Sequence, residues 1–139
     1  TIAQTPSSRA PLMAAGLETL TNIDSGRHLV IIKETARGNA VSFGNKANAQ
    51  RPRAGSNSTV KYNMNREPVT SADATVRRPA DVGLHHELSH ADHISQGTVD
   101  MSPATNPNNP HMEEETTINQ DNLYRDSREI PRRSDHRTL

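Results

Sequence analysis

The sequence is organised around one stretch, Leu84-His85-His86-Glu87-Leu88-Ser89-His90-Ala91-Asp92-His93-Ile94. Its first apolar residue is followed by others four, seven and ten positions later, which is the period of an amphipathic α-helix. At about 100° per residue, the histidines fall on a different face from this apolar stripe. The pattern predicts a helix over residues 81–96 that starts after Pro79 and stops at Gly97. We expect the stripe to face a core and the histidines to face a cleft.

Within this stretch, His86-Glu87-Leu88-Ser89-His90 fits H-E-x-x-H, a spacing that zinc peptidases use. Residues four apart stack about one turn apart on a helix, so His86 and His90 can bind one tetrahedral Zn²⁺. Glu87 is then placed beside the ion, where its carboxylate can take a proton from a bound water. The pattern predicts a metal-dependent hydrolase. The alternative is a solvated, histidine-rich helix face that holds no metal.

A catalytic zinc site needs a third protein ligand, and the histidines nearby do not supply it. Along a straight helix, His93 lies about 10 Å from His86, which is too far to share one ion. We expect His93 to support the site or to lie on the surface, and His85 to point away from it. The metzincin pattern is excluded, because Gln96 stands where that pattern has its last histidine.

Two acidic segments remain as sources of the third ligand. Gly97-Thr98-Val99-Asp100 resembles the zinc-binding G-T-x-D element of aspzincins, although the Tyr-Gly pair of that element is replaced by Pro103-Ala104. Glu113-Glu114-Glu115 opens a predicted helix, where carboxylates also complement the helix dipole without any metal. Three adjacent carboxylates repel one another, however, and a cation would relieve that repulsion.

Within the glutamate run, only one side chain can face the zinc squarely, because neighbours on a helix point about 100° apart. Glu114 has the small Thr117 three residues later, which leaves room for close packing against the motif helix. We therefore predict Glu114 as the third ligand. Glu115 and Asp100 remain the alternatives.

Hydrophobic period and turn residues predict the remaining elements. In chain order they are a loose leader over residues 1–11, a short helix around 12–20, a buried strand at 29–33, a turn at Gly38-Asn39 with a partner strand at 40–43, a long loop over 44–57, an edge strand at 59–63, and a helix from Pro110, capped by Asn109, to about 125. The basic tail, residues 128–139, is expected to fray, apart from docking of Ile130-Pro131. We expect one domain over residues 1–139. Its fold class is α+β and zincin-like, with a short β-sheet, the H-E-x-x-H helix and a second helix that supplies the third ligand.

Composition limits the classes of protein that this chain can belong to. Only 31% of the 139 residues are apolar, with no Trp, one Phe and two Tyr, so the core must be small and aliphatic. A bound metal would add stability to such a core. The formal net charge is zero, which argues against nucleic acid or an anionic membrane as a partner. No stretch has the length of a membrane-spanning helix, and the absence of Cys excludes disulfides and thiolate zinc sites.

Several of these motifs together resemble a known family. The core His86-Glu87-Leu88-Ser89-His90-Ala91, the glutamate run, Asn122-x-x-Arg125 and Pro131-x-Arg133 are similar to the M91-type zinc metallopeptidases over residues 84–133. These are effector proteases that bacteria inject through type III secretion, and related domains extend the C-terminus of type VI secretion spike (VgrG) proteins. The first residue, Thr1, suits such an extension of a larger secreted protein.

The resemblance implies a role for most of the motif residues. It makes His86 and His90 zinc ligands, Glu87 the catalytic base and the glutamate run the source of the third ligand. Asn122 and Arg125 match motif positions without an assigned role. The implied location is outside the producing cell, in a bacterial periplasm or a host cytoplasm.

We therefore expect a gluzincin-like zinc peptidase that acts on a protein or peptide. An extended substrate would pair with the edge strand at 59–63, and Tyr124, His93 or Arg125 would supply an extra donor. Two alternatives stay open, namely a non-catalytic metal-binding adaptor of a secretion apparatus and a zinc amidase that acts on cell-wall peptides.

Overall fold

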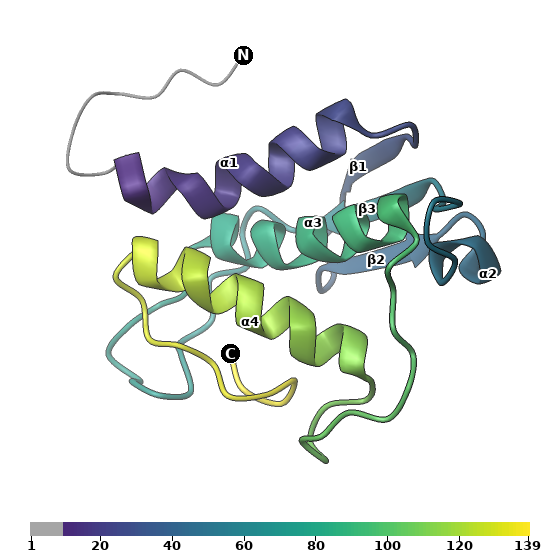
Figure 1. Ribbon diagram of the computed structural model, residues 1–139. Helices are drawn as coiled ribbons and strands as arrows, with labels where there is room; N and C mark the ends of the chain where they lie inside the picture. Colours follow the sequence, from purple (N-terminus) through teal and green to yellow (C-terminus); the bar gives the residue numbers. More distant parts are fainter. Residues whose placement is uncertain (1–9) are drawn as a thin grey trace.

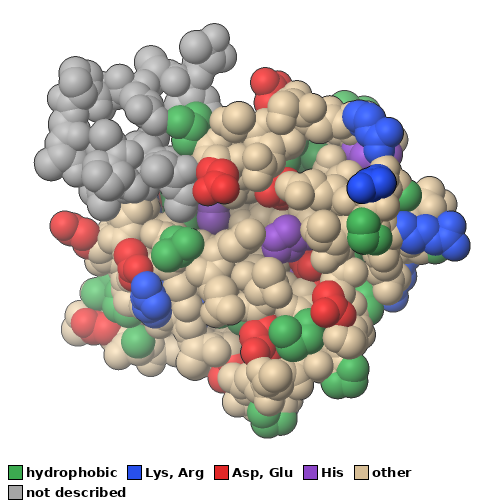
Figure 2. Space-filling model, in the orientation of Figure 1, with side chains coloured by type: hydrophobic (Ala, Val, Ile, Leu, Met, Phe, Trp, Pro, Cys, Tyr) green, Lys and Arg blue, Asp and Glu red, His purple; other side chains and the backbone are tan. Residues whose placement is uncertain are grey.

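The computed structural model of the chain describes residues 10–139 (Figure 1). Its elements follow in the order α1 (Ala10–Ser25), β1 (Val30–Glu34), β2 (Ala40–Phe43), α2 (Lys46–Ala49), β3 (Ser58–Tyr62), α3 (Ala80–Gln96) and α4 (Met112–Ser127). The predicted α+β class is confirmed. Figure 1 shows α3 in the middle of the molecule, where it contacts α1, α4, β3 and β2. On the face seen in this view, histidine side chains reach the surface only as small patches (Figure 2).

The three strands form one sheet in the order β1-β3-β2. β1 runs parallel to β3, and β2 runs antiparallel to it. The predicted pairing of residues 29–33 with 40–43 is therefore wrong, because β3 lies between these two strands. The prediction of an edge strand at 59–63 is also wrong. β3 takes the centre because its fully buried Val60 packs against Leu88 and Ala91 of α3.

β1 was expected to be buried, and this prediction is wrong too. Ile31 and Ile32 are 41% and 52% exposed, and only Val30 packs against the core cluster around Val60. A run of β-branched residues fits the pleated backbone of an edge strand as well as that of a buried one, so the composition alone did not separate the two.

The motif helix α3 confirms the prediction for residues 81–96 to within one residue. It stops at Gly97, whose φ is 74° and whose N–H bonds to the carbonyls of His93 and Ile94. The predicted apolar stripe faces the core, where Leu88 and Ala91 meet the sheet and Ile94 packs with Ala49 and Val99. The opposite face is covered by α1 and α4 rather than exposed.

The helices around α3 differ in length from their predictions. α4 begins at Met112, after His111 at the cap position, rather than at Pro110. α1 is longer than predicted, and Ala10 lies inside it rather than in a loose leader. Residues 1–9 of the predicted leader lie outside the described residues. Gly16 allows α1 to approach α4, because a Cβ there would lie 2.9 Å from the Tyr124 ring. The predicted loop over 44–57 contains the short helix α2.

The C-terminal tail packs against the helices, so the expectation that it frays is wrong. Ile130 is buried, which confirms its predicted docking, and Arg133 and Asp135 are buried as well. The amide of Asn122 accounts for part of this order, since it donates to the Arg133 carbonyl and accepts from the Arg133 N–H, both at 2.9 Å. In the described part of the chain, no helix combines the length and the apolar character that a bilayer crossing requires.

Substitution of Gly97 by alanine is expected to destabilise the protein by about 1–3 kcal/mol. The residue has positive φ, and an added Cβ would lie 1.8 Å from the Arg51 carbonyl oxygen. The free energy of unfolding in urea measures the effect. Gly38→Ala is the matched control, because nothing lies within 4 Å of the Cβ position there. Equal stability of the two variants would contradict this account of how α3 ends.

Candidate metal centre

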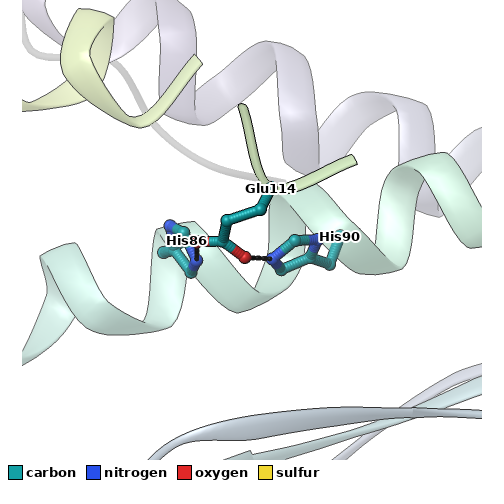
Figure 3. Close-up of side chains that lie close together, drawn as sticks. All are labelled: His86, His90 and Glu114. Atoms are coloured by element: carbon teal, nitrogen blue, oxygen red, sulfur yellow. Dashed lines mark ion pairs between the residues drawn. The ribbon is translucent and has the colours of Figure 1, made fainter. Parts of the chain in front are cut away.

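The helices α3 and α4 bring three potential metal ligands together. His86 and His90 lie one turn apart on the side of α3 that contacts α4, and Glu114 comes from the first turn of α4. One atom from each side chain lies within 4.8 Å of the other two. Figure 3 shows the Glu114 carboxylate reaching between the two imidazole rings.

The distances around Glu114 fit the binding of a cation. His86 Nε2 lies 3.2 Å from Glu114 Oε1, and His90 Nε2 lies 3.2 Å from Glu114 Oε2. All three side chains are buried. Two imidazole nitrogens and one carboxylate oxygen form a common ligand set of catalytic zinc. The residues present therefore fit a divalent metal.

The two alternative carboxylates point elsewhere. Asp100 Oδ1 accepts hydrogen bonds from the N–H of Ser102 at 2.9 Å and from its hydroxyl at 2.5 Å. Glu115 accepts from the Thr105 hydroxyl and from the Asn106 N–H. Among the described residues, neither belongs to the group that could hold a metal.

Glu113 holds His90 from the side away from Glu114. Glu113 Oε1 accepts from His90 Nδ1 at 2.8 Å, from His93 Nδ1 at 2.7 Å and from the Thr117 hydroxyl at 3.1 Å. Since a carboxylate can only accept, the proton of neutral His90 is on Nδ1, and its Nε2 lone pair is directed at the metal position. His93 therefore supports the site through Glu113. It is buried, so of its two predicted positions it takes the one that supports the site and not the one on the surface.

Electrostatics in this metal-free arrangement follow from the same contacts. Burial lowers the pKa of His90, but hydrogen bonds to Glu113 and Glu114 outweigh burial and raise it to about 9. Burial raises the pKa of Glu113, yet its hydrogen bonds from His90 and His93 bring it down to about 2. Burial also opposes ionisation of Glu114, and bonds from His86 and His90 hold its pKa far below the usual range. Positive charge is therefore favoured where the three ligands meet.

The residues of the tail motif position a further cation beside His86. Arg125 is fully buried, donates to Asp121 at 3.0 Å and donates to the Pro131 carbonyl at 3.0 Å. Together with the two bonds of Asn122 to Arg133, this fastens the tail to α4. Arg133 Nη1 then lies 3.5 Å from His86 Nδ1. Asn122 and Arg125, which had no assigned role, thus hold the tail in place.

Glu87 lines a cavity of about 230 Å³ next to His86. Its side chain is partly buried, and among the described residues it forms no ion pair or hydrogen bond. Its carboxylate is therefore open to contact with a molecule in the cavity.

Sequence reasoning missed several residues near the ligands. Arg78, Arg133 and His136 line the Glu87 cavity, and His136 Nδ1 lies 3.2 Å from Glu114 Oε1. Arg133 belongs to the Pro131-x-Arg133 motif, but no spacing pattern in the sequence connects Arg78 or His136 with α3. The donors expected from the sequence are occupied elsewhere. Tyr124, for example, donates to Asp81 at 2.8 Å and stacks on His85.

Comparison with known proteins gave one match. The family model Peptidase_M91, described as effector protein, matches residues 4–134. This range contains Glu87 and the three converging ligands and ends two residues before His136. No curated protein and no solved structure matched the chain.

The stability of the metal-free protein is expected to fall between about pH 7 and about pH 10. The pKa of His90 is raised from 6.5 to about 9, so its contribution is complete below pH 6.5 and is lost as pH rises through 9. Glu113 has the opposite sign, with a contribution that is present above pH 4.5 and lost as pH falls through about 2. The loss at high pH is at most roughly 3 kcal/mol.

Urea unfolding of chelator-treated protein across this range measures the effect. His90→Gln removes the titrating ring and should flatten the decline. Identical pH profiles for wild type and His90→Gln would contradict the assigned contacts.

Loss of the Asn122 amide should release the tail. Asn122→Ala removes two buried hydrogen bonds to Arg133 and is expected to cost about 1–3 kcal/mol of stability. Backbone amide hydrogen exchange should rise in residues 130–136 more than in α3. Asn119→Ala, an exposed position on the same helix, is the control. Unchanged exchange in the tail would show that other contacts hold it.

Proposed function

Because the chain belongs to the peptidase M91 family of effector proteins, we propose that it is a zinc-dependent metallopeptidase that cleaves peptide bonds in a protein substrate. The observation that carries this proposal is the convergence of His86, His90 and Glu114 beside the cavity that Glu87 lines. Two of the ligands, His86 and His90, and the base Glu87 have the spacing that H-E-x-x-H peptidases use, and Glu114 is added by α4. The zincin-like assignment of the fold is part of the proposal.

The ligand roles follow from the free atoms at the site. His86 and His90 each direct Nε2 at the buried Glu114 carboxylate, so an ion between them would contact all three side chains. Zn²⁺ held there would lower the pKa of a water and polarise the scissile carbonyl. A neutral His90 is required for binding, and Glu113 selects the tautomer that leaves Nε2 open.

Glu87 is the general base of this proposal. It takes a proton from the attacking water and delivers it to the leaving amine nitrogen. Its access to the cavity and the absence of an ion pair in the described chain support that role, because a paired carboxylate would be a weaker base. His136 and Arg133 line the same cavity, and we assign them as donors for the carbonyl oxygen.

The substrate would lie along β2 rather than along β3. β2 is an edge strand whose outer backbone groups are available for pairing, whereas β3 is paired on both sides. Gly38 and Asn39, which precede β2, line the Glu87 cavity. A peptide added to β2 would therefore pass next to the base.

The family also bears on where the protein acts. Membership of an effector family supports action inside a target cell, on protein substrates. We place the chain in a larger secreted protein, as a toxin domain carried by a type VI secretion spike, with the periplasm of a bacterium or the cytoplasm of a host cell as its destination.

Glu87→Gln is expected to abolish cleavage while the fold and the metal remain. The amide cannot accept the proton, so kcat/KM should fall by at least about 10²-fold. Mass spectrometry of a proteome-derived peptide library after incubation reads cleavage, and metal analysis reads the ion content. Glu67→Gln, at an exposed position, is the matched control.

This experiment also separates the peptidase from a metal-binding adaptor. An adaptor would bind zinc equally in both variants and cleave nothing in any form. Full activity of Glu87→Gln would show that another group is the base.

A further inference from the structure

The cavity beside Glu87 is lined by an unusual number of cationic side chains. Arg66, Arg78 and Arg133 all contribute to its wall, and Glu87 is the one acidic residue among the lining residues of the described chain. These arginines come from three separate segments, namely the chain after β3, the residue before Pro79 at the start of α3, and the tail. Their convergence is a property of the fold that no local sequence pattern contains.

Arg78 is buried and lacks a charged partner. Its side chain belongs to a residue that is 5% exposed, and its Nε has no hydrogen-bond partner. Within residues 10–139, its guanidinium forms no ion pair. A buried charge without a counterion is costly, and proteins normally pair it.

Most of the charged groups around Arg78 are also cationic, which favours binding of an anion beside it. Burial, together with Arg125, Arg133 and Arg66, lowers the pKa of Arg78 to about 10, so it stays protonated at neutral pH. Asp121 acts in the opposite direction, but its carboxylate already accepts from Arg125 at 3.0 Å. The positive charge on Arg78 therefore has no committed partner.

The other two arginines leave room for an anion as well. Arg133 donates to the backbone carbonyls of Asp135 and His136, and its Nη1 lies 3.5 Å from His86 Nδ1, so its partners are uncharged backbone groups and an imidazole. It forms no ion pair in the described chain. Arg66 is exposed, and its side chain likewise has no ion-pair partner there. The three cations thus surround a space that can accept a negative group.

A structural role explains only part of this arrangement. Arg78 Nη2 lies 2.9 Å from the position of a Cβ at Gly83, so the guanidinium packs closely on the first turn of α3. A neutral side chain of similar size would fill that space without the cost of burying a charge. Packing alone therefore does not account for an arginine here.

We propose that this cavity is a subsite for a carboxylate of the substrate, bound by Arg78 with Arg66 and Arg133 beside it. This inference rests on the proposed peptidase function and specifies its substrate class. Arginine presents a planar fork that matches a carboxylate in a bidentate pair. Because Glu87 lines the same cavity, the carboxylate lies close to the cleaved bond, within about two residues at roughly 3.5 Å per residue.

The carboxylate has two possible sources, an acidic side chain and the C-terminus of the substrate. A peptide library with amidated C-termini retains only the first source, and a library with neutral side chains and free C-termini retains only the second. Zinc-loaded protein is expected to cleave one of these libraries, with an enriched acidic position or a fixed distance to the C-terminus. Equal cleavage of fully neutral, amidated peptides would overturn the proposal.

Variants of the arginines connect this preference to the cavity. Arg78→Gln is expected to lower kcat/KM for the preferred peptide about 10- to 100-fold, and to lower kcat/KM for its neutral counterpart much less. Arg77→Gln, the exposed neighbour outside the cavity, should match wild type. Arg66→Gln changes an exposed cavity residue and should also weaken the preference, so the proposal stays testable if Arg78→Gln fails to fold. Wild-type selectivity in Arg66→Gln and in every folded Arg78 variant would overturn the proposal.

A binding measurement tests the subsite without cleavage. Metal-free wild-type protein is titrated with succinate and with succinamide, and amide chemical shifts near residues 78 and 133 are followed by NMR. Saturable shifts with succinate alone, lost in Arg66→Gln, support the subsite even if no peptide is cleaved. Absence of saturable succinate binding would overturn it. Failure of the peptidase function would instead appear as a lack of cleavage alongside intact succinate binding.

Discussion

The structure depends on one contact between helices, in which the Glu114 carboxylate of α4 reaches both His86 and His90 of α3. A buried carboxylate is costly unless positive charge compensates it. Without a bound metal, protonated histidine provides that charge, because hydrogen bonds to Glu113 and Glu114 outweigh the effect of burial and raise the pKa of His90 to about 9. A divalent cation would supply the same compensation to the same three side chains. The packing of α4 on α3 and the capacity to bind a metal therefore have one physical origin.

The three consecutive glutamates at the start of α4 point in different directions and bind different partners. Glu114 faces the two histidines, Glu113 accepts from His90 and His93, and Glu115 binds the loop before the helix. Adjacent helical side chains diverge by about 100°, so three consecutive carboxylates can serve three sets of partners. The tail adds a further layer, because Asn122 and the buried Arg125 of α4 fix it beside His86. The site thus combines the two histidines and Glu87 of α3 with the carboxylates of α4 and the tail that α4 holds.

Short-range signals in the sequence predicted the parts of the fold that depend on short-range physics. The apolar period and Gly97 placed α3 within one residue, and the structure brings Glu114, the predicted third ligand, to His86 and His90. Strand order was not predictable in this way, since the choice of β3 as the central strand depends on burial of Val60 against α3. Arg78 and His136 reach the cavity from segments without periodicity, and only the folded chain brings them to Glu87. Their roles required the structure.

The most direct measurement is X-ray diffraction at the zinc absorption edge from crystals of the zinc-loaded chain. One strong anomalous peak is expected, bonded to His86, His90 and Glu114 at about 2.0–2.2 Å from each ligand atom. Glu113 should remain outside the coordination sphere, bonded to His90. A peak bonded to a different set of side chains, or the absence of any ordered ion at full zinc saturation, would contradict the assignment of this metal centre.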